Sequence, residues 1–136
     1  MTSRAHIAEV LREGEALTLT VNGECMMPTL CPGSCITAQK ANKYLPGDVL
    51  VFTTSHDSML VHRLLGTLPG ERLLCKADRE PRPDALLPIT RVVGRVIEIE
   101  GQPLRTQATK RLTCCLAFAW HLTRLATAKL VPRKTV

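Results

Sequence analysis

Hydrophobic and polar residues follow strand-like patterns over the first hundred positions, which predicts a protein built mainly from short β-strands. Leu17–Val21 alternates apolar and polar residues, as a strand with one buried face does. Val49–Phe52 is continuously apolar, which is typical of a strand buried on both faces. Four further segments have a similar character: Cys35–Ala38, Met59–Leu65, Arg72–Lys76 and Arg91–Ile99. Turn residues separate these runs, so we expect one sheet of roughly six to eight strands.

The pattern changes at both ends of the chain. Apolar residues at helical spacing predict a short N-terminal helix within residues 1–16. From Ala108 to Leu130 the period becomes helical, with one apolar face made of Leu112, Cys115, Leu116, Ala119, Thr123, Ala126 and Leu130. We therefore divide the chain into the N-terminal segment, a β domain over residues 17–101, and an amphipathic helical tail over residues 102–136. The proline-rich segment Ala77–Pro88 is expected to be a loop.

Charge and cysteine content add a setting to this outline. Residues 1–100 carry 11 Lys and Arg against 12 Asp and Glu, whereas residues 101–136 carry seven Lys and Arg and no acid. The basic excess therefore belongs to the tail, which points to a partner of the tail. No export signal is visible, so we expect the six cysteines to be reduced thiols and the protein to be cytoplasmic. The longest apolar run, Leu112–Leu122, is too short to span a membrane.

Cys25 is the first candidate for chemistry. It follows the turn signal Asn22–Gly23, and Met26, Met27 and Pro28 come directly after it. A thiol on a turn beside a stiff apolar segment is well placed to meet an extended substrate. Free cysteine is also among the most buried residue types, so a purely structural role is the alternative.

Five blocks of sequence carry a likeness to a known family. In chain order they are Gly23–Leu30, Pro46–Phe52, Val61–Leu64, Cys75–Asp78 and Val93–Val96. In this order and spacing the chain resembles the type I signal peptidase family and its repressor-autopeptidase relatives over about residues 17–100. The resemblance implies a mainly β, signal-peptidase-like fold, with the nucleophile in the first block and the base in the third.

The resemblance assigns roles by position, with two departures. Cys25 stands where the family has serine, and His62 stands where most bacterial members have lysine, as in the histidine-using branch. That branch is thought to add an aspartate, and Asp78 and Asp84 are the matching positions, with Asp78 preferred. A Cys–His pair is chemically consistent, because imidazolium stabilises thiolate. A carboxylate on the other ring nitrogen would fix the tautomer of His62.

The first block also supplies the expected contacts to substrate. The backbone N–H of Cys25 would be one oxyanion donor. Gly23 occupies the position where many relatives carry a second, side-chain donor, so that donor is absent or replaced by backbone. Gly23, Met26, Met27 and Pro28 are the expected substrate-binding residues. The substrate would be a peptide or protein precursor, such as a leader peptide, bound as an added strand. No cofactor or metal is expected.

Several alternatives remain open. The chain could be a catalytically inactive peptide-binding member of the same fold. A self-cleaving repressor is disfavoured, because the segment before the first strand is too short for a DNA-binding domain. Four cysteines could bind zinc, although their spacing lacks the usual close pairs, or Cys25 could form a redox pair with a neighbour: Cys25, Cys31, Cys35 and Cys75.

The tail has two main interpretations. Residues 109–134, with Phe118, Trp120 and flanking basic residues, could lie at an anionic membrane surface. Alternatively, the helix could pack its apolar face on the sheet and leave its basic residues in solvent. Nucleic acid is disfavoured as a partner, because aromatic stacking residues are scarce.

Overall fold

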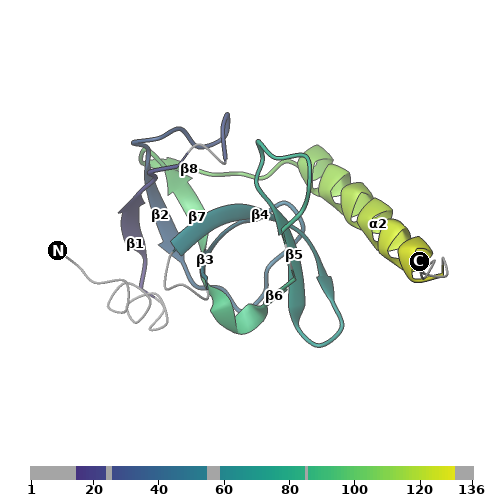
Figure 1. Ribbon diagram of the computed structural model, residues 1–136. Helices are drawn as coiled ribbons and strands as arrows, with labels where there is room; N and C mark the ends of the chain where they lie inside the picture. The colour runs from purple at the N-terminus through teal and green to yellow at the C-terminus, as the bar shows by residue number, and fades with distance from the viewer. Residues whose placement is uncertain (1–14, 24–25, 55–58, 85, 131–136) are drawn as a thin grey trace.

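The computed structural model describes residues 15–23, 26–54, 59–84 and 86–130 of the chain. The expected N-terminal helix falls on residues 1–14, apart from its last two positions, and so lies outside the described residues. The described chain forms a curled antiparallel sheet with one long helix beside it, so the protein is mainly β (Figure 1).

The sheet has eight strands within the described ranges. They are β1 (Leu17–Thr20), β2 (Cys35–Gln39), β3 (Val49–Thr53), β4 (Met59–Leu68), β5 (Arg72–Lys76), β6 (Leu87–Pro88), β7 (Val92–Ile99) and β8 (Gln102–Pro103). Their order is β1-β2-β7-β3-β4-β5-β6, and β8 pairs with β7. A short 3-10 helix, η1 (Ile89–Arg91), precedes β7. Because β7 inserts between β2 and β3, it joins the N-terminal strand pair to the rest of the sheet (Figure 1).

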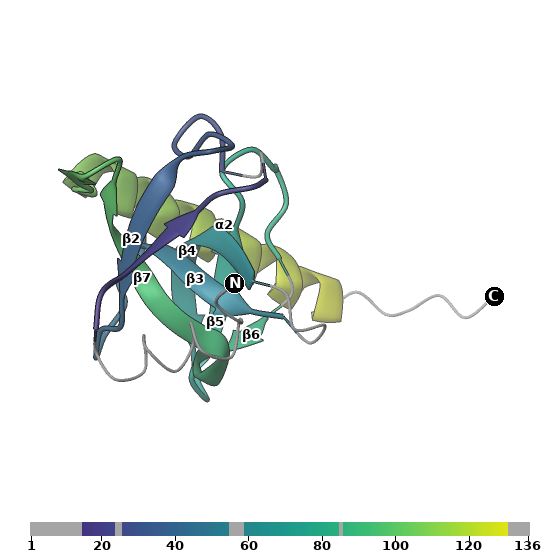
Figure 2. The ribbon, with the colours of Figure 1, turned by 90° about the vertical axis from the view of Figure 1, so that its left-hand side faces the viewer.

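Irregularities in strand register accompany the curl of the sheet. The register shifts between Thr37 and Ala38 in β2, between Val51 and Phe52 in β3, and between Leu64 and Gly66 in β4. Each such irregularity bends its strand and raises the local twist. Figure 2 shows the strands crossing one another at marked angles, with the helix running behind them.

The two faces of the sheet have separate cores. Alternate residues of a strand point to opposite faces, and β3 is buried on both, as its unbroken apolar sequence predicted. The first cluster contains Val21, Met26, Leu30, Ile36, Ala38, Val49, Val51, Val93 and Val96. The second contains Leu50, Phe52, Leu64, Leu73, Cys75, Leu87 and Val92. The central strand therefore ties both cores together.

The six predicted strands are all present, and two short ones were missed. β5 has its predicted bounds, whereas β4 continues to Leu68. The prediction that Ala77–Pro88 is loop throughout is wrong at its end, because Leu87 and Pro88 pair with β5 as β6. Proline suits that place, since β6 lies at the sheet edge, where a missing N–H costs nothing. β8 was missed because its hairpin turn places Glu100, a residue uncommon at positive φ, at φ 51°.

The C-terminal helix, α2 (Ala108–Leu130), has the predicted bounds but packs through a different face. Cys114, Ala117 and Phe118 contact the cluster formed by Leu65 of β4 and Leu74 of β5. The alternative in which the predicted apolar face covers the sheet is wrong, because two members of that face, Leu112 and Leu116, are 60% and 63% exposed. No helix in the described part of the chain combines the length and the apolar character needed to cross a membrane.

A glycine in β4 makes the helix contact close. A Cβ atom built on Gly66 would lie 2.5 Å from Cγ of Phe118, far inside van der Waals contact. We expect Gly66→Ala to lower the free energy of unfolding by about 1–3 kcal/mol through overpacking. Phe118→Leu introduced into the Gly66→Ala protein should recover part of that loss. Urea unfolding of wild type, the two single variants and the double variant measures both effects. Strictly additive changes in the free energy of unfolding would contradict the contact between Phe118 and Gly66.

Candidate functional site

His62 lies in β4, where it pairs with a residue of β3 and packs beside a buried aromatic ring. It is opposite Leu50 of β3 in the antiparallel register. Its side chain is 9% exposed, and its ring meets the Phe52 ring edge-on, with centroids 5.6 Å apart. The imidazole is therefore held by backbone pairing and by packing in the second cluster. Phe52 was not singled out by the sequence, although its position in a continuously buried strand was.

Asp84 is the carboxylate that contacts His62. Its Oδ2 lies 2.5 Å from Nδ1 of His62. The backbone N–H of Asp84 donates to the carbonyl of Cys75 at 2.8 Å, which fixes the loop against β5. The other ring nitrogen, Nε2, is buried and has no hydrogen-bond partner among the described residues. The carboxylate of Asp84 therefore orients Nδ1, and Nε2 is free to accept a proton from another group.

Asp78 has a different partner, so the preference for Asp78 as the residue that orients His62 is wrong. Its two oxygens accept hydrogen bonds from Nε and Nη2 of Arg63 at 2.8 and 2.9 Å, and Oγ1 of Thr29 donates to it at 2.7 Å. Burial raises the pKa of Asp78, but the hydrogen bonds from Arg63 and Thr29 and the nearby cationic charges outweigh burial and lower the pKa below its ordinary value. Both aspartates lie in one loop, and adjacent strand residues face opposite ways, so His62 and Arg63 each meet one of them.

Arg63 also connects the blocks of sequence that carry the family likeness. Its Nη1 donates to the carbonyl of Gly47 at 2.7 Å, and its Nη2 lies 3.4 Å from Oγ1 of Thr29. The backbone N–H of Asp78 points to Sδ of Met26 at 3.3 Å. The first four blocks therefore meet around one buried guanidinium group.

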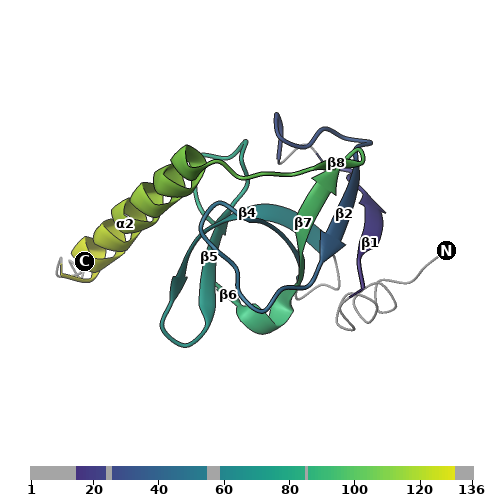
Figure 3. The same cartoon turned by 180° about the vertical axis from the view of Figure 1, so that it is seen from behind.

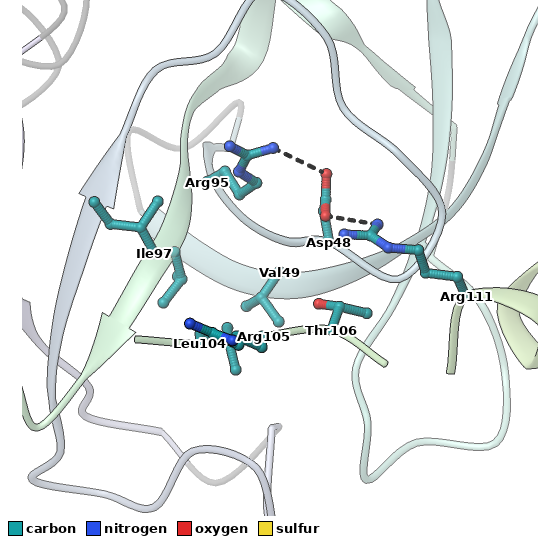
Figure 4. A pocket seen from close by; sticks show the side chains of 9 residues that line it. Asp48, Val49, Arg95, Ile97, Leu104, Arg105, Thr106 and Arg111 are labelled. Atoms are coloured by element: carbon teal, nitrogen blue, oxygen red, sulfur yellow. Dashed lines mark hydrogen bonds and ion pairs between the residues drawn. The ribbon is translucent and has the colours of Figure 1, made fainter. Parts of the chain in front are cut away.

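Asp48 makes the remaining connection, from the second block to the fifth and to α2. It is 3% exposed, accepts a hydrogen bond from Arg111 at 2.9 Å, and lies 3.6 Å from Nη1 of Arg95. Figure 4 shows Asp48 between these two arginines. A pocket of about 310 Å³ opens beside them, and Arg105 lines it as well. None of its lining residues belongs to the His62 site, and Asp48 already neutralises part of its positive charge.

The expected substrate-binding residues divide into buried and exposed ones. Met26 packs in the first core cluster and is 2% exposed, so its assignment as a substrate contact is wrong: its apolar side chain fills the core. Gly23 and Pro28 are exposed, and Met27 is partly exposed. Cys25 itself lies outside the described residues.

Two strand edges have only one neighbour in the described chain. β1 pairs with β2 alone. β4 pairs with β3 over Met59–Arg63, but its pairing with β5 begins only at Arg63. The backbone of Met59–His62 thus leaves one side without a strand partner among the residues described, directly before the imidazole. Such an edge can accept an extended peptide.

The described cysteines differ sharply in their environment. Cys75 is buried, and burial together with the charge of Asp84 raises its pKa to about 12. Burial also raises the pKa of Cys114, whereas Cys31, Cys35 and Cys115 are exposed. Within the ranges described, no group of three His, Cys, Asp or Glu residues is arranged to hold a metal ion.

This contrast predicts a labelling pattern. At pH 8 in the native state, iodoacetamide should modify Cys31, Cys35 and Cys115 and spare Cys75 and Cys114, because only thiolate reacts and buried thiols stay protonated. Denaturation in urea should make all of them reactive. Peptide mapping by mass spectrometry measures the extent at each site, and rapid native labelling of Cys75 would refute its assigned burial.

Comparisons of the sequence with protein-family models and with curated proteins gave no match.

Proposed function

We propose that this chain is a signal-peptidase-like endopeptidase in which Cys25 is the nucleophile, His62 the general base and Asp84 the carboxylate that orients it. The observation that carries the proposal is the buried imidazole, with Nδ1 on Asp84 and Nε2 without a partner in the described chain. An imidazole held in this way suits proton transfer to and from a nucleophile. The substrate would be a peptide or protein precursor, such as a leader peptide.

The proposed reaction follows ordinary acyl-transfer chemistry. The thiol of Cys25 gives its proton to Nε2 of His62, and the sulfur attacks the scissile carbonyl carbon to form a tetrahedral intermediate. The carbon–nitrogen bond then breaks as His62 returns the proton to the leaving amine. His62 next takes a proton from water as the water oxygen attacks the carbonyl carbon of the thioester. The carbon–sulfur bond then breaks, the carboxylic acid is released, and His62 returns the proton to the sulfur of Cys25. Asp84 accepts the hydrogen bond from Nδ1 throughout and so keeps the required tautomer.

The polar contacts around Arg63 support this assignment. They anchor Met26 and Thr29, which follow Cys25 closely in sequence, to the loop that also carries Asp84. Arg63 is the residue directly after His62, so one strand would serve both the anchor and the base. The proposal requires the Cys25 thiol to reach hydrogen-bond distance of Nε2.

The edges of β4 and β1 that have no second strand partner among the described residues support binding of the substrate as an extended strand. A peptide along Met59–Val61 would form backbone hydrogen bonds that end beside His62, so affinity would depend little on side chains. These edges do not involve the thiol. They therefore also favour the second candidate function, a protein of the same fold that binds peptides without cleaving them.

Digestion of a complex peptide library separates the two candidates. Wild-type protein should generate new peptide termini that mass spectrometry detects, and Cys25→Ala should generate none. Cys115→Ala, which removes an exposed thiol far along the chain, is the matched control and should retain full cleavage. Equal cleavage by Cys25→Ala would refute the proposed nucleophile. Retention of extended peptides by wild type, with no new termini, would establish the peptide-binding function instead.

A further inference from the structure

The helix α2 carries an apolar stripe on the side that does not contact the sheet. Leu112, Leu116 and Trp120 recur every four residues, so they lie on one side of the helix, and they are 60%, 63% and 62% exposed. Cys115 and Ala119 lie between them and are exposed as well. Figure 1 and Figure 3 show α2 at the end of the molecule away from β1, beside β4 and β5, with its outer side uncovered by other described elements.

The orientation of this stripe is fixed by contacts on the opposite side of the helix. Cys114 and Phe118 are packed on Leu65 and Leu74, and a residue two positions from Leu112 lies almost half a turn away from it. Arg111 anchors the first turn through Asp48 and the carbonyl of Pro46. The helix therefore cannot bury the stripe against its own sheet without giving up these contacts.

Charge indicates what covers the stripe. The stripe residues are uncharged, Arg124 is exposed four residues after Trp120 and so lies on the same side of the helix, and the sequence from residue 101 to 136 has seven basic residues and no acidic one. Two copies meeting through this stripe would bring their basic segments together, which is unfavourable. An anionic surface would be attracted to the same charges. Tryptophan beside exposed leucines is also typical of helices that lie at the boundary between lipid headgroups and acyl chains.

We infer that the outer stripe of α2 binds anionic lipid bilayers, with the helix lying parallel to the surface. Leu112, Leu116 and Trp120 enter the headgroup–acyl boundary, and Arg124 contacts lipid phosphates. The inference is independent of the proposed peptidase activity, because it uses no residue of the His62 site.

The single tryptophan makes the inference directly testable, since all indole fluorescence comes from Trp120. With vesicles of phosphatidylcholine containing one quarter phosphatidylglycerol, we expect a blue shift of the emission, quenching by brominated lipid, and co-flotation of the protein. Binding should weaken with added salt and be at least about tenfold weaker for vesicles of phosphatidylcholine alone.

Variants identify the surface. Leu112→Ser/Leu116→Ser should weaken binding to anionic vesicles by at least about tenfold, because it removes apolar area from the stripe. Leu45→Ser is the matched control, since Leu45 is an exposed leucine outside α2 at 41% exposure, and it should bind as wild type does. Circular dichroism checks that α2 remains folded in each protein.

Three results would overturn the inference. They are an unchanged Trp120 spectrum with anionic vesicles, equal binding of the double variant, and equal binding to uncharged vesicles. Light scattering after size-exclusion chromatography measures the oligomeric state and so tests whether a second copy of the chain covers the stripe instead. A stable dimer that Leu112→Ser/Leu116→Ser dissociates would show that a second copy covers the stripe, and that result too would refute lipid binding by this face.

Discussion

Asp84→Asn is expected to lower the rate of peptide cleavage by about 10³- to 10⁴-fold while the protein stays folded. A carboxylate at Nδ1 can only accept a hydrogen bond, so it keeps the proton on Nδ1 and leaves Nε2 free to act as a base. An asparagine amide can donate to Nδ1 instead, which places the proton on the wrong nitrogen. Measurement of kcat/KM on a peptide cleaved by the wild-type protein tests the effect. The alkylation rate of Cys25 near pH 6 gives a second readout that needs no substrate, and it should fall as well.

Asp78→Asn is the informative control, because Asp78 is in the same loop but contacts Arg63. It should lose stability, yet in the fraction that remains folded, Cys25 should keep its reactivity. Equal activity of Asp84→Asn and wild type would remove Asp84 from the mechanism. A comparable loss of reactivity in folded Asp78→Asn would indicate that the two aspartates act as one unit.

Arg63→Met is expected to lower the free energy of unfolding by about 3–5 kcal/mol, the usual cost of removing one partner from a buried ion pair. The side chains of Arg63 and Asp78 are only 7% and 10% exposed, so Asp78 would remain in the interior without its compensating charge. Arg63→Met/Asp78→Leu should be more stable than Arg63→Met, because no uncompensated charge remains. Arg95→Met is the matched control: its group is 36% exposed and 3.6 Å from Asp48, so we expect a loss of about 1 kcal/mol or less. Urea unfolding at pH 7 compares these proteins.

The same ion pair predicts a dependence on pH. The folded pKa of Asp78 is below its ordinary value of 3.8, so folding favours the ionised form. The resulting stabilisation is fully present above the unfolded-state pKa and is lost as pH falls through the folded one. The stability difference between wild type and Asp78→Asn should therefore be constant from pH 7 to about pH 5 and shrink below pH 4. A difference that stays constant down to pH 3 would contradict the lowered pKa.

The sequence predicted the strands better than it predicted the contacts between side chains. Period-two and continuously apolar patterns depend on burial, which is a local property, so β3 and β5 appeared within a residue of their bounds. β6 and β8 were not predicted because two-residue strands have no detectable period. In addition, β6 contains a proline, and the turn before β8 has a glutamate at positive φ, which is uncommon. For α2 the helical period was clear, but both sides of the helix carry apolar residues, and the space left by Gly66 decides which side packs.

The candidate site was also predicted only in part, because side-chain contacts between distant segments cannot be seen in a local pattern. The family resemblance selected His62 and two aspartates by their positions in the sequence blocks, yet only the fold separates Asp84 from Asp78. Thr29 and Arg63 determine that separation, and their pairing spans segments far apart in the sequence. No local pattern contains such a pairing, whereas the alternation of His62 and Arg63 along β4 could have suggested that each needs its own acidic partner.

Mounting α2 on the strand that carries His62 has a mechanical consequence. Phe118 of α2 packs against Gly66, which follows His62 a few residues later in the same strand, β4. A ligand that tilts or lifts the helix would strain this strand. If such a ligand changes the affinity for substrate by a given factor, substrate must change the affinity for that ligand by the same factor. The long strand β4 would thus couple binding at the outer surface of α2 to the buried imidazole of His62.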